Sequence, residues 1–558
     1  MVLQVLAILA LTYLVWSLVA MEINYRRAST MGIPRIRLCI DGGNLLWQFS
    51  QSYVWCLLDL LGLELGNFRY SRRGWATYDK AKTHIRHGPA WALVTPRRIY
   101  VYVVDSKAIN DIFQRRSDFL RPTEAYKILE VYGPCISTAS PENWPRHRKV
   151  MATPFNENAM SFLWDESIKQ SEQMVKTWTS SKTGQIKSVA KDTRTVSLNV
   201  IAAIGFRKSY PFRSANEPQE EDSQDPTNYR DALQIVLDHC IMLMVIPRKW
   251  LSLPFAPSSW HKVAKASKGF QQHMTRMLNE EVKALNEGKA GSGSMMTSFV
   301  RAMDLNQKTG AEIKGQDTPM KGLTVDEIFG NIFVINFAGH DTTANTLAFA
   351  IMLLSAYPDI QSWITEELRQ ITPEEMQGSY AELFPKLKRC QAILHETLRV
   401  FAPVNVLQKK VDDQPQSLQI GEKTVIFPPK TYVFANIAAA HAYPEYWDEP
   451  EKWNPSRWIK PSGNGDLIDE SLITPARCTY FPWAEGPQNC PGNKFSQVEF
   501  VAVMARLLRD HRISAVPNPG ETNEQLRTRI LAVAHDVDMQ LLVRMKDPDR
   551  VRLACRRI

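Results

Sequence analysis

The chain has 558 residues, 44% of them hydrophobic and 22% charged, a balance typical of a globular protein that excludes wholesale disorder. Its Lys and Arg residues, which give a formal net charge of +9, are spread along the sequence rather than clustered with aromatic residues, so nucleic-acid binding is not expected. Eight cysteines in so long a chain show neither the density of a disulfide scaffold nor paired zinc-ligand spacing, which indicates a reducing environment.

The first residues form a long apolar stretch, because Met1 to Met21 contains no charged side chain. About 20 such residues at helical rise cross the core of a bilayer. Basic residues follow the stretch and none precedes it, so the positive-inside rule places the rest of the chain on the cytoplasmic side. These residues are Arg26, Arg27, Arg35 and Arg37. A cleaved signal peptide is the alternative, but the basic n-region is missing and the run is long for one. We therefore predict a single-pass transmembrane anchor over residues 1–21.

A second apolar stretch, Leu45 to Leu65, carries polar residues that would be costly inside hydrocarbon. They are Gln48, Gln51, Asp59 and Glu64. This pattern favours a helix that lies on the membrane or covers the core. Residues 22–70 are therefore predicted to form a linker and a membrane-proximal helix.

After a predicted strand at residues 100–104, the chain becomes mainly helical, which indicates a mainly α fold with small β-sheets. Trp144 and Arg148 are four residues apart, so they present a donor ring and a cation on one helical face. That pair suits an anionic carboxylate. Simple packing of the two side chains is the alternative.

The longest predicted helix begins at Thr324, where Thr324 and Glu327 have the form of a capping box, and continues to the break at Pro358. Its centre contains Gly339 and two consecutive threonines, residues that weaken the hydrogen-bond ladder of a helix. A buried helix weakened in this way is expected to make room for a ligand. Core polar residues with satisfied bonds are the alternative.

Glu396 and Arg399 are three residues apart on a predicted helix and therefore share a face. Arg457 can complete a buried network around Glu396, since arginine makes bidentate bonds to a carboxylate.

A single cysteine, Cys490, lies in a loop rich in Gly and Pro just before a helical pattern over Asn493 to Leu508. A thiolate there gains from the amide groups and the positive dipole end of the following helix. Gly486 and Gly492 let the loop backbone approach a flat ligand closely. The arrangement favours an iron-ligating thiolate over the alternative, a buried structural thiol.

These motifs resemble those of the cytochrome P450 family. The Cys490 loop is similar to the haem-ligand signature of the family, and Glu396 with Arg399 matches its ExxR pair. Arg457 matches the arginine that follows, and Ala338 to Thr343 matches the oxygen-activation motif. The resemblance covers essentially the whole chain, with the motifs in the right order. It is strongest with fungal members of secondary metabolism, which share the Gly-Pro-Gln-Asn-Cys-Pro-Gly style of the cysteine loop.

The resemblance implies a cytochrome P450 fold, with residues 71–558 as a haem-thiolate monooxygenase catalytic domain that binds haem b. Cys490 would be the axial ligand of the iron, and Asp341 with Thr342 the acid-alcohol pair that delivers protons. The further expected haem contacts are Trp144, Arg148, Trp483, Gly486, Gly492 and Gly339. The network of Glu396, Arg399 and Arg457 would be structural.

The same resemblance implies a microsomal protein, single-pass in the endoplasmic reticulum membrane, with its catalytic domain facing the cytoplasm. Its partners would be dioxygen and NADPH-cytochrome P450 reductase. The substrate would be a hydrophobic small molecule, a secondary-metabolite intermediate. The expected pocket regions are Val131 to Ser137, Ile241 to Ile246, Phe337 with Ala338, Pro403 to Leu407, and Ile530 to Val533.

Two residues of the cysteine loop depart from the family pattern. Trp483 stands where Phe is typical, and Gln488 stands where a basic residue commonly holds a haem propionate. Gln can donate a hydrogen bond but carries no charge, so neutralisation of the propionate would depend more on Arg148 and others.

Two other functions stay open. A haem-thiolate isomerase or dehydratase acting on a peroxide is disfavoured by the Asp341–Thr342 pair. A non-catalytic haem-binding sensor or electron carrier is disfavoured by the apolar helix centre, which implies a substrate pocket.

Overall fold

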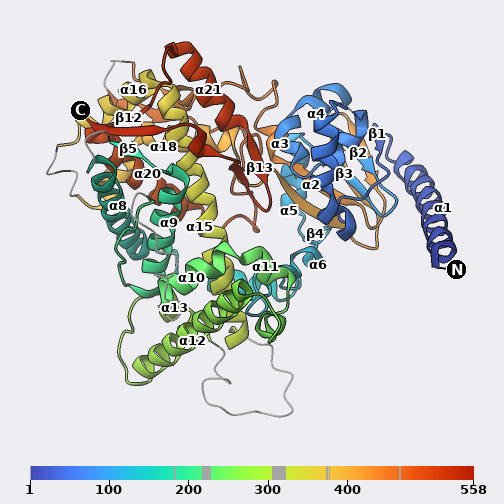
Figure 1. Ribbon diagram of the computed structural model, residues 1–558, viewed down its shortest axis with the longest axis horizontal. Helices are drawn as coiled ribbons and strands as arrows, with labels where there is room; N and C mark the ends of the chain where they lie inside the picture. The colour runs from blue at the N-terminus through green and yellow to red at the C-terminus, as the bar shows by residue number, and fades with distance from the viewer. Residues whose placement is uncertain are drawn as a thin grey trace.

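The structure, a computed structural model, describes residues 2–63, 65–180, 184–215, 228–303, 322–372, 375, 378–463 and 467–558. Helices make up most of the described chain, as the sequence predicts, and a sheet-rich part lies beside the N-terminal helix (Figure 1).

Helix α1 (Val2–Ser29) projects away from the rest of the molecule (Figure 1). Its segment Ala7–Ser29 is long and apolar enough to cross a membrane. The helix continues eight residues beyond the predicted boundary at Met21, because Glu22 and Arg26 form an i,i+4 ion pair at 2.9 Å. At its C-terminal end, Met21 and Ala28 are buried in the core that also contains the sheet.

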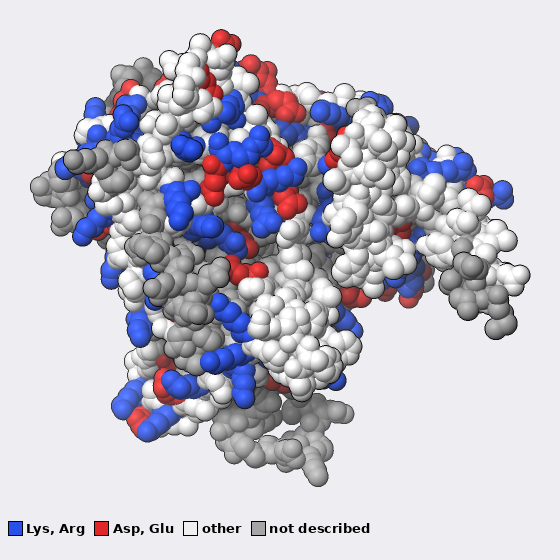
Figure 2. Space-filling view, viewed as in Figure 1, with Lys and Arg blue, Asp and Glu red and all other residues white. Residues whose placement is uncertain are grey.

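Helix α2 (Leu45–Leu60) turns its apolar side outward. Trp47, Gln51 and Trp55 face the protein, and the Trp47 indole donates to the Ser71 carbonyl at 2.9 Å. We call the opposite side the α2 apolar face; its exposed residues are Leu45, Leu46, Phe49, Tyr53, Leu57 and Leu60. Figure 2 shows an uncharged surface over this helix. Such a contiguous apolar surface is rare on soluble monomers and indicates a contact with something apolar.

A six-stranded sheet has the order β1-β2-β3-β9-β6-β4. The predicted strand at residues 100–104 is confirmed as β3, which pairs in parallel with β9 and antiparallel with β2. The strands are β1 (Arg35–Arg37), β2 (Ala90–Val94), β3 (Ile99–Val103), β9 (Tyr432–Asn436), β6 (Val406–Val411) and β4 (Phe119–Leu120).

The remaining strands form short pairs and a three-stranded sheet of order β12-β15-β5. They are β5 (Gln185–Ile186), β7 (Gln416–Ile420), β8 (Lys423–Phe427), β10 (Ile459–Lys460), β11 (Ser471–Leu472), β12 (His511–Ala515), β13 (Val537–Met539), β14 (Val543–Met545) and β15 (Leu553–Arg557).

Helix α15 (Val325–Ala356) crosses the helical part and is buried along most of its length. The predicted capping box is confirmed, since the Thr324 and Glu327 side chains each accept from the backbone of the other. The helix is not interrupted at its centre, where the Thr342 hydroxyl donates to the Ala338 carbonyl at 2.8 Å. Gly339 serves packing, because a Cβ there would lie 2.7 Å from Ile201 Cδ1.

The helices that surround α15 in the core are α9 (Val189–Phe206), α18 (Lys388–Val400) and α20 (Asn493–Asp510). The other helices are α3 (Trp75–Asp79), α4 (Lys82–His87), α5 (Ser106–Gln114), α6 (Thr123–Tyr126), α7 (Trp144–Ala152), α8 (Glu157–Thr179), α10 (Tyr229–Asp238), α11 (Cys240–Val245), α12 (Ser258–Asn286), α13 (Met295–Arg301), α16 (Pro358–Arg369), α17 (Tyr380–Leu383), α19 (Ile437–Ala440) and α21 (Asn523–His535).

The buried carboxyl of Glu499 on α20 makes the stability of this core depend on pH. Burial raises the pKa of Glu499 to about 8, against the lowering effect of the Ser197 hydroxyl. Between the unfolded pKa of about 4.3 and the folded value, the folded protein keeps a proton that the unfolded chain has lost, so stability falls as pH rises through this window. Glu499→Gln removes that loss and should gain roughly 5 kcal/mol over the unmodified protein by pH 8.

The measurement is thermal unfolding from pH 5 to pH 9. Glu280→Gln, the same change on the exposed side of α12, is the control and should run parallel to the unmodified protein. A Glu499→Gln profile that also runs parallel would contradict the prediction.

Candidate active site

A cavity of about 380 Å³ lies between the Cys490 loop and the middle of α15. Helix α15 lines it with mainly apolar residues and with Thr342, and the segment leading into β6 adds Pro403, Val404 and Leu407. Most of the wall is therefore apolar, which suits a hydrophobic occupant.

Cys490 lines this cavity, and a backbone hydrogen bond closes the loop that carries it. The Cys490 N–H donates to the Trp483 carbonyl at 2.8 Å, and α20 begins three residues after the cysteine. Burial raises the pKa of the Cys490 thiol, while the Gly492 amide and Arg148 oppose that rise. A bound metal cation would favour the thiolate form of Cys490, because a thiol that coordinates a metal is deprotonated.

Of the three glycines predicted to contact the cofactor, Gly339 and Gly492 line the cavity. Gly486 lies outside the lining and has a φ of 72°, and a Cβ there would lie 3.0 Å from the Phe113 carbonyl oxygen. Gly486 therefore lets the loop turn and pack against the end of α5.

Helix α7 brings Trp144 and Arg148 to the cavity on one face, as their spacing predicts. Arg148 donates to the Asn489 carbonyl at 2.8 Å and also to the Asn489 side chain. The Trp144 indole N–H is buried without a hydrogen-bond partner among the described residues. A buried donor without a partner is costly, so this N–H is suited to a ligand that accepts.

Two cations, Arg121 and Arg148, line the cavity, and a third, Lys409, lies outside the lining but binds Gln488, which belongs to it. Lys409 Nζ donates to Gln488 Oε1 at 2.6 Å, and Arg121 donates to the Ile136 carbonyl at 3.1 Å. None of the three has an acidic partner among the described residues. Burial, together with the nearby Arg121, lowers the pKa of Lys409 to about 7. Such a group of buried cations is stabilised by an anionic ligand.

This donor set fits the haem that the sequence motifs imply. Cys490 is the one cysteine among the lining residues, and the cations with the Trp144 N–H supply donors that would suit the two carboxylates of a haem. Sequence reasoning missed Arg121 and Lys409. The sequence has no signal that singles out Lys409, because β6 also contains Gln408 and a second lysine, Lys410.

Asp341 and Thr342 are neighbours in sequence but face different surroundings. Thr342 lines the cavity, whereas Asp341 does not. The Asp341 carboxylate lies 2.9 Å from Arg194 Nη2 on α9, and Arg194 lies 3.4 Å from Asp238 at the end of α10. Asp341 and Arg194 are partly exposed, at 21% and 34% of their side chains, so the acid communicates with solvent. Arg194 was also missed by sequence reasoning.

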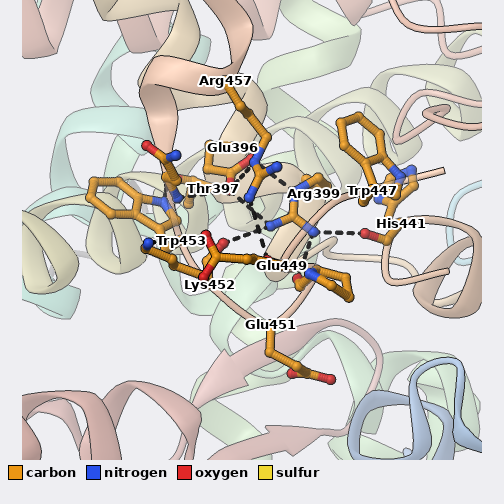
Figure 3. A network of polar contacts seen from close by, with 12 residues as sticks. Glu396, Thr397, Arg399, His441, Trp447, Glu449, Glu451, Lys452, Trp453 and Arg457 are labelled. Atoms are coloured by element: carbon orange, nitrogen blue, oxygen red, sulfur yellow. Dashed lines mark hydrogen bonds and ion pairs between the residues drawn. The ribbon is translucent and has the colours of Figure 1, made fainter. Parts of the chain in front are cut away.

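The predicted network around Glu396 is present (Figure 3), with Glu396 and Arg399 fully buried and Arg457 partly buried. Arg399 makes two bonds of 2.8 Å to the Glu396 carboxylate, and Arg457 Nε adds a third at 3.1 Å. Arg399 also donates to the carbonyls of His441 and Pro450. The network holds α18 to the segment before the Cys490 loop and touches no cavity residue, in agreement with a structural role.

The expected pocket regions are found in part. Ile136, Ser137, Phe337 and Ala338 line the cavity, as do Pro403, Val404 and Leu407. The prediction was wrong for Ile241 to Ile246, because α11 turns Ile241 and Val245 to the surface. It was also wrong for Ile530 to Val533, because Ile530 and Val533 are packed into the main core. Leu542 is the late residue that reaches the cavity.

Comparison with known proteins gives one consistent family. The family model of cytochrome P450 matches residues 64–541. A cytochrome P450 monooxygenase of Arthrobotrys oligospora is 28% identical over 575 aligned residues, covering 97% of this chain and 96% of the relative. The phomenoic acid biosynthesis cluster cytochrome P450 monooxygenase of Leptosphaeria maculans is 25% identical, covering 93% of this chain and 94% of the relative.

Solved structures agree on the fold. The crystal structure of the cytochrome P450DA heme domain matches with a TM-score of 0.65 and 17% identity. The match covers 94% of this chain and 98% of that chain.

Proposed function

Because the chain belongs to the cytochrome P450 family, we propose that it is a membrane-bound haem-thiolate monooxygenase that oxidises a hydrophobic small molecule with dioxygen. The observation that carries the proposal is the placement of Cys490 at an apolar cavity beneath α15, with unpaired cations at one edge. That combination suits a flat apolar ligand with an iron centre and a carboxylate edge.

In this proposal Cys490 holds the iron of haem b. Arg121, Arg148, Lys409 and the Trp144 N–H hold its propionates. Bound haem supplies dioxygen binding and activation, to which the thiolate contributes electron density.

Proton delivery is assigned to Asp341 and Thr342. Asp341 takes protons from solvent on the α9 side, where its carboxylate pairs with Arg194. Thr342 lines the cavity, and its hydroxyl, which donates to the Ala338 carbonyl in the structure, is proposed to pass the proton on.

The substrate is proposed to be an apolar intermediate of secondary metabolism, because the cavity wall includes apolar residues such as Val334, Phe337 and Leu407. The relative from Leptosphaeria maculans bears the name of a biosynthesis cluster, which supports this class. The electrons are proposed to come from NADPH through a cytochrome P450 reductase, and the net charge of +9 suits an acidic partner.

Helix α1 is proposed to be the single membrane span, in the endoplasmic reticulum, with the catalytic domain in the cytoplasm. Arg26, Arg27, Arg35 and Arg37 at its domain end support this orientation. The α2 apolar face is proposed to lie in the membrane surface beside α1, since no described element covers it.

The first test is the carbon monoxide difference spectrum of the reduced protein. We expect a long-wavelength, thiolate-type Soret band that Cys490→Ala abolishes and that Cys478→Ala, a change at a buried cysteine outside the cavity lining, leaves in place. A histidine-type band in the unmodified protein, unchanged in Cys490→Ala, would remove the proposal.

The second test concerns Lys409 and the haem propionates. A charge-assisted hydrogen bond contributes about 1.5–3 kcal/mol, so haem should leave the Lys409→Met protein roughly 10–100 times faster than the unmodified protein. The rate is measured by transfer of haem to apomyoglobin. Lys410→Met is the matched control, because Lys410 pairs with Glu124 instead, at 2.9 Å. Equal rates for both variants would exclude Lys409 as a propionate partner.

The third test separates the monooxygenase from a peroxide isomerase or dehydratase, which needs no NADPH-dependent oxygen uptake. With reductase, NADPH and an apolar compound that shifts the haem spectrum, we expect oxygen uptake with product formation. Asp341→Asn should slow product formation about 100-fold or more, because positioned proton transfer is worth 10²–10⁴ in rate. Asp238→Asn, on the other side of Arg194, should stay near the unmodified rate. Product without oxygen uptake would favour the isomerase.

A further inference from the structure

A row of aromatic rings leads from the Cys490 loop into the protein on a route separate from the cavity. The ring centres of Trp483 and Tyr480 are 6.5 Å apart, those of Tyr480 and Trp458 are 4.6 Å apart, and those of Trp458 and Trp447 are 5.4 Å apart. We call these four rings the aromatic chain. Only Trp483 lines the cavity, and its carbonyl accepts from the Cys490 N–H.

The far end of the aromatic chain approaches the protein surface. Trp447 is 8% exposed, and the half-buried rings of Trp363 and Tyr446 pack against the same cluster. The aromatic chain therefore connects the site of Cys490 with the solvent through closely spaced, oxidisable side chains. Phe, the residue typical at the position of Trp483, would lack the easily oxidised indole at the cavity end.

Two rings of the aromatic chain also have partners that make loss of an electron easier. The Tyr480 hydroxyl lies 3.0 Å from His395 Nδ1, and burial lowers the pKa of His395 to about 4, so its imidazole is neutral and accepts a proton near pH 7. The Trp458 indole donates to Glu396 Oε2 at 2.9 Å, and the negative carboxylate stabilises a positive indole.

We propose that the aromatic chain is a one-electron relay that returns electrons to the haem site when peroxide oxidises it in the absence of substrate. This protective activity is distinct from substrate oxidation, and it rests on the proposed function, because Cys490 must hold a haem.

The electrons and protons balance as follows. Hydrogen peroxide takes two electrons from the haem site and, with two protons, becomes two molecules of water. Tyr480 gives one electron back to that site through Trp483, and its phenolic proton moves to His395 Nδ1. Trp458 then reduces the tyrosyl radical while the proton returns from His395 to the Tyr480 oxygen, and Trp447 reduces Trp458. A one-electron reductant in solution, such as a thiol or ascorbate, restores Trp447, and a second cycle supplies the second electron.

The experiment treats the full-length ferric holoprotein, without substrate, with hydrogen peroxide. Rapid-freeze electron paramagnetic resonance detects organic radicals, peptide mass spectrometry locates the oxidised residues, and absorbance follows haem bleaching. We expect radicals and oxidation on Tyr480, Trp458 and Trp447. Tyr480→Phe keeps the ring but removes the transferable proton, so the radical yield should fall severalfold and bleaching should speed up severalfold.

Trp453→Phe is the matched control. Trp453 is buried in the same segment as Trp458 and donates to Thr397 at 3.3 Å, but among the described residues the only ring it contacts is that of Tyr357. In Figure 3 it lies on the opposite side of Arg399 from Trp447. This variant should bleach at the unmodified rate.

Oxidation confined to Trp144 or to residues outside the aromatic chain would overturn the relay, as would equal bleaching of Tyr480→Phe and Trp453→Phe. The location of oxidation in the unmodified protein needs no variant, so a Tyr480→Phe protein that fails to fold does not remove the test. The carbon monoxide spectrum separates the two proposals. A thiolate band without oxidation on the aromatic chain overturns the relay alone, whereas the absence of that band in the unmodified protein overturns the proposed function and the relay with it.

Discussion

The buried carboxylate of Glu396 is the interaction on which the rest of this structure depends. It accepts five hydrogen bonds, two from Arg399 and one each from Arg457, the Trp458 indole and the Asn454 amide. Removing one partner of such a buried group costs about 3–5 kcal/mol, because the remaining charges lose their compensation. The network fixes the segment that precedes the Cys490 loop against α18, and through that loop it fixes where the thiol faces the cavity. The same carboxylate also holds the Trp458 ring in the aromatic chain.

Features set by local spacing were predictable from the sequence. The capping box at Thr324 and the shared face of Trp144 and Arg148 depend only on helical geometry, which a few neighbouring residues determine. The Glu396 network was predictable because Arg399 is three residues from Glu396 on one helical face, and because arginines such as Arg399 and Arg457 bind a buried carboxylate well. The sequence also indicated that α2 belongs near a membrane, although only the structure shows that its aromatic residues Trp47 and Trp55 face inward and its leucines outward.

Features set by the packing of distant segments were not predictable. Lys409 meets Gln488 only because β6 passes beside the Cys490 loop, and Arg194 meets Asp341 only because α9 packs closely on α15. Gly339 was assigned to the cofactor, and its position in the cavity wall agrees, but its missing side chain also allows that close approach of α9. The loss of a basic residue at Gln488 is thus compensated from a strand about 80 residues earlier in the chain.

The different surroundings of Asp341 and Thr342 have a consequence for how the substrate selectivity of this enzyme can evolve. Successive residues of a helix point about 100° apart, so α15 separates two compartments by the width of a single backbone. One side of the helix faces the mainly apolar cavity. The other side is charged and partly exposed to solvent, and there Asp341 pairs with Arg194 of α9. Cavity residues such as Phe337 and Leu407 are therefore free to vary, and to accept new guests, without disturbing the ionic surroundings of the acid. With Asp341 in the proton-donor role proposed above, an architecture of this kind lets selectivity evolve while the supply of protons stays constant.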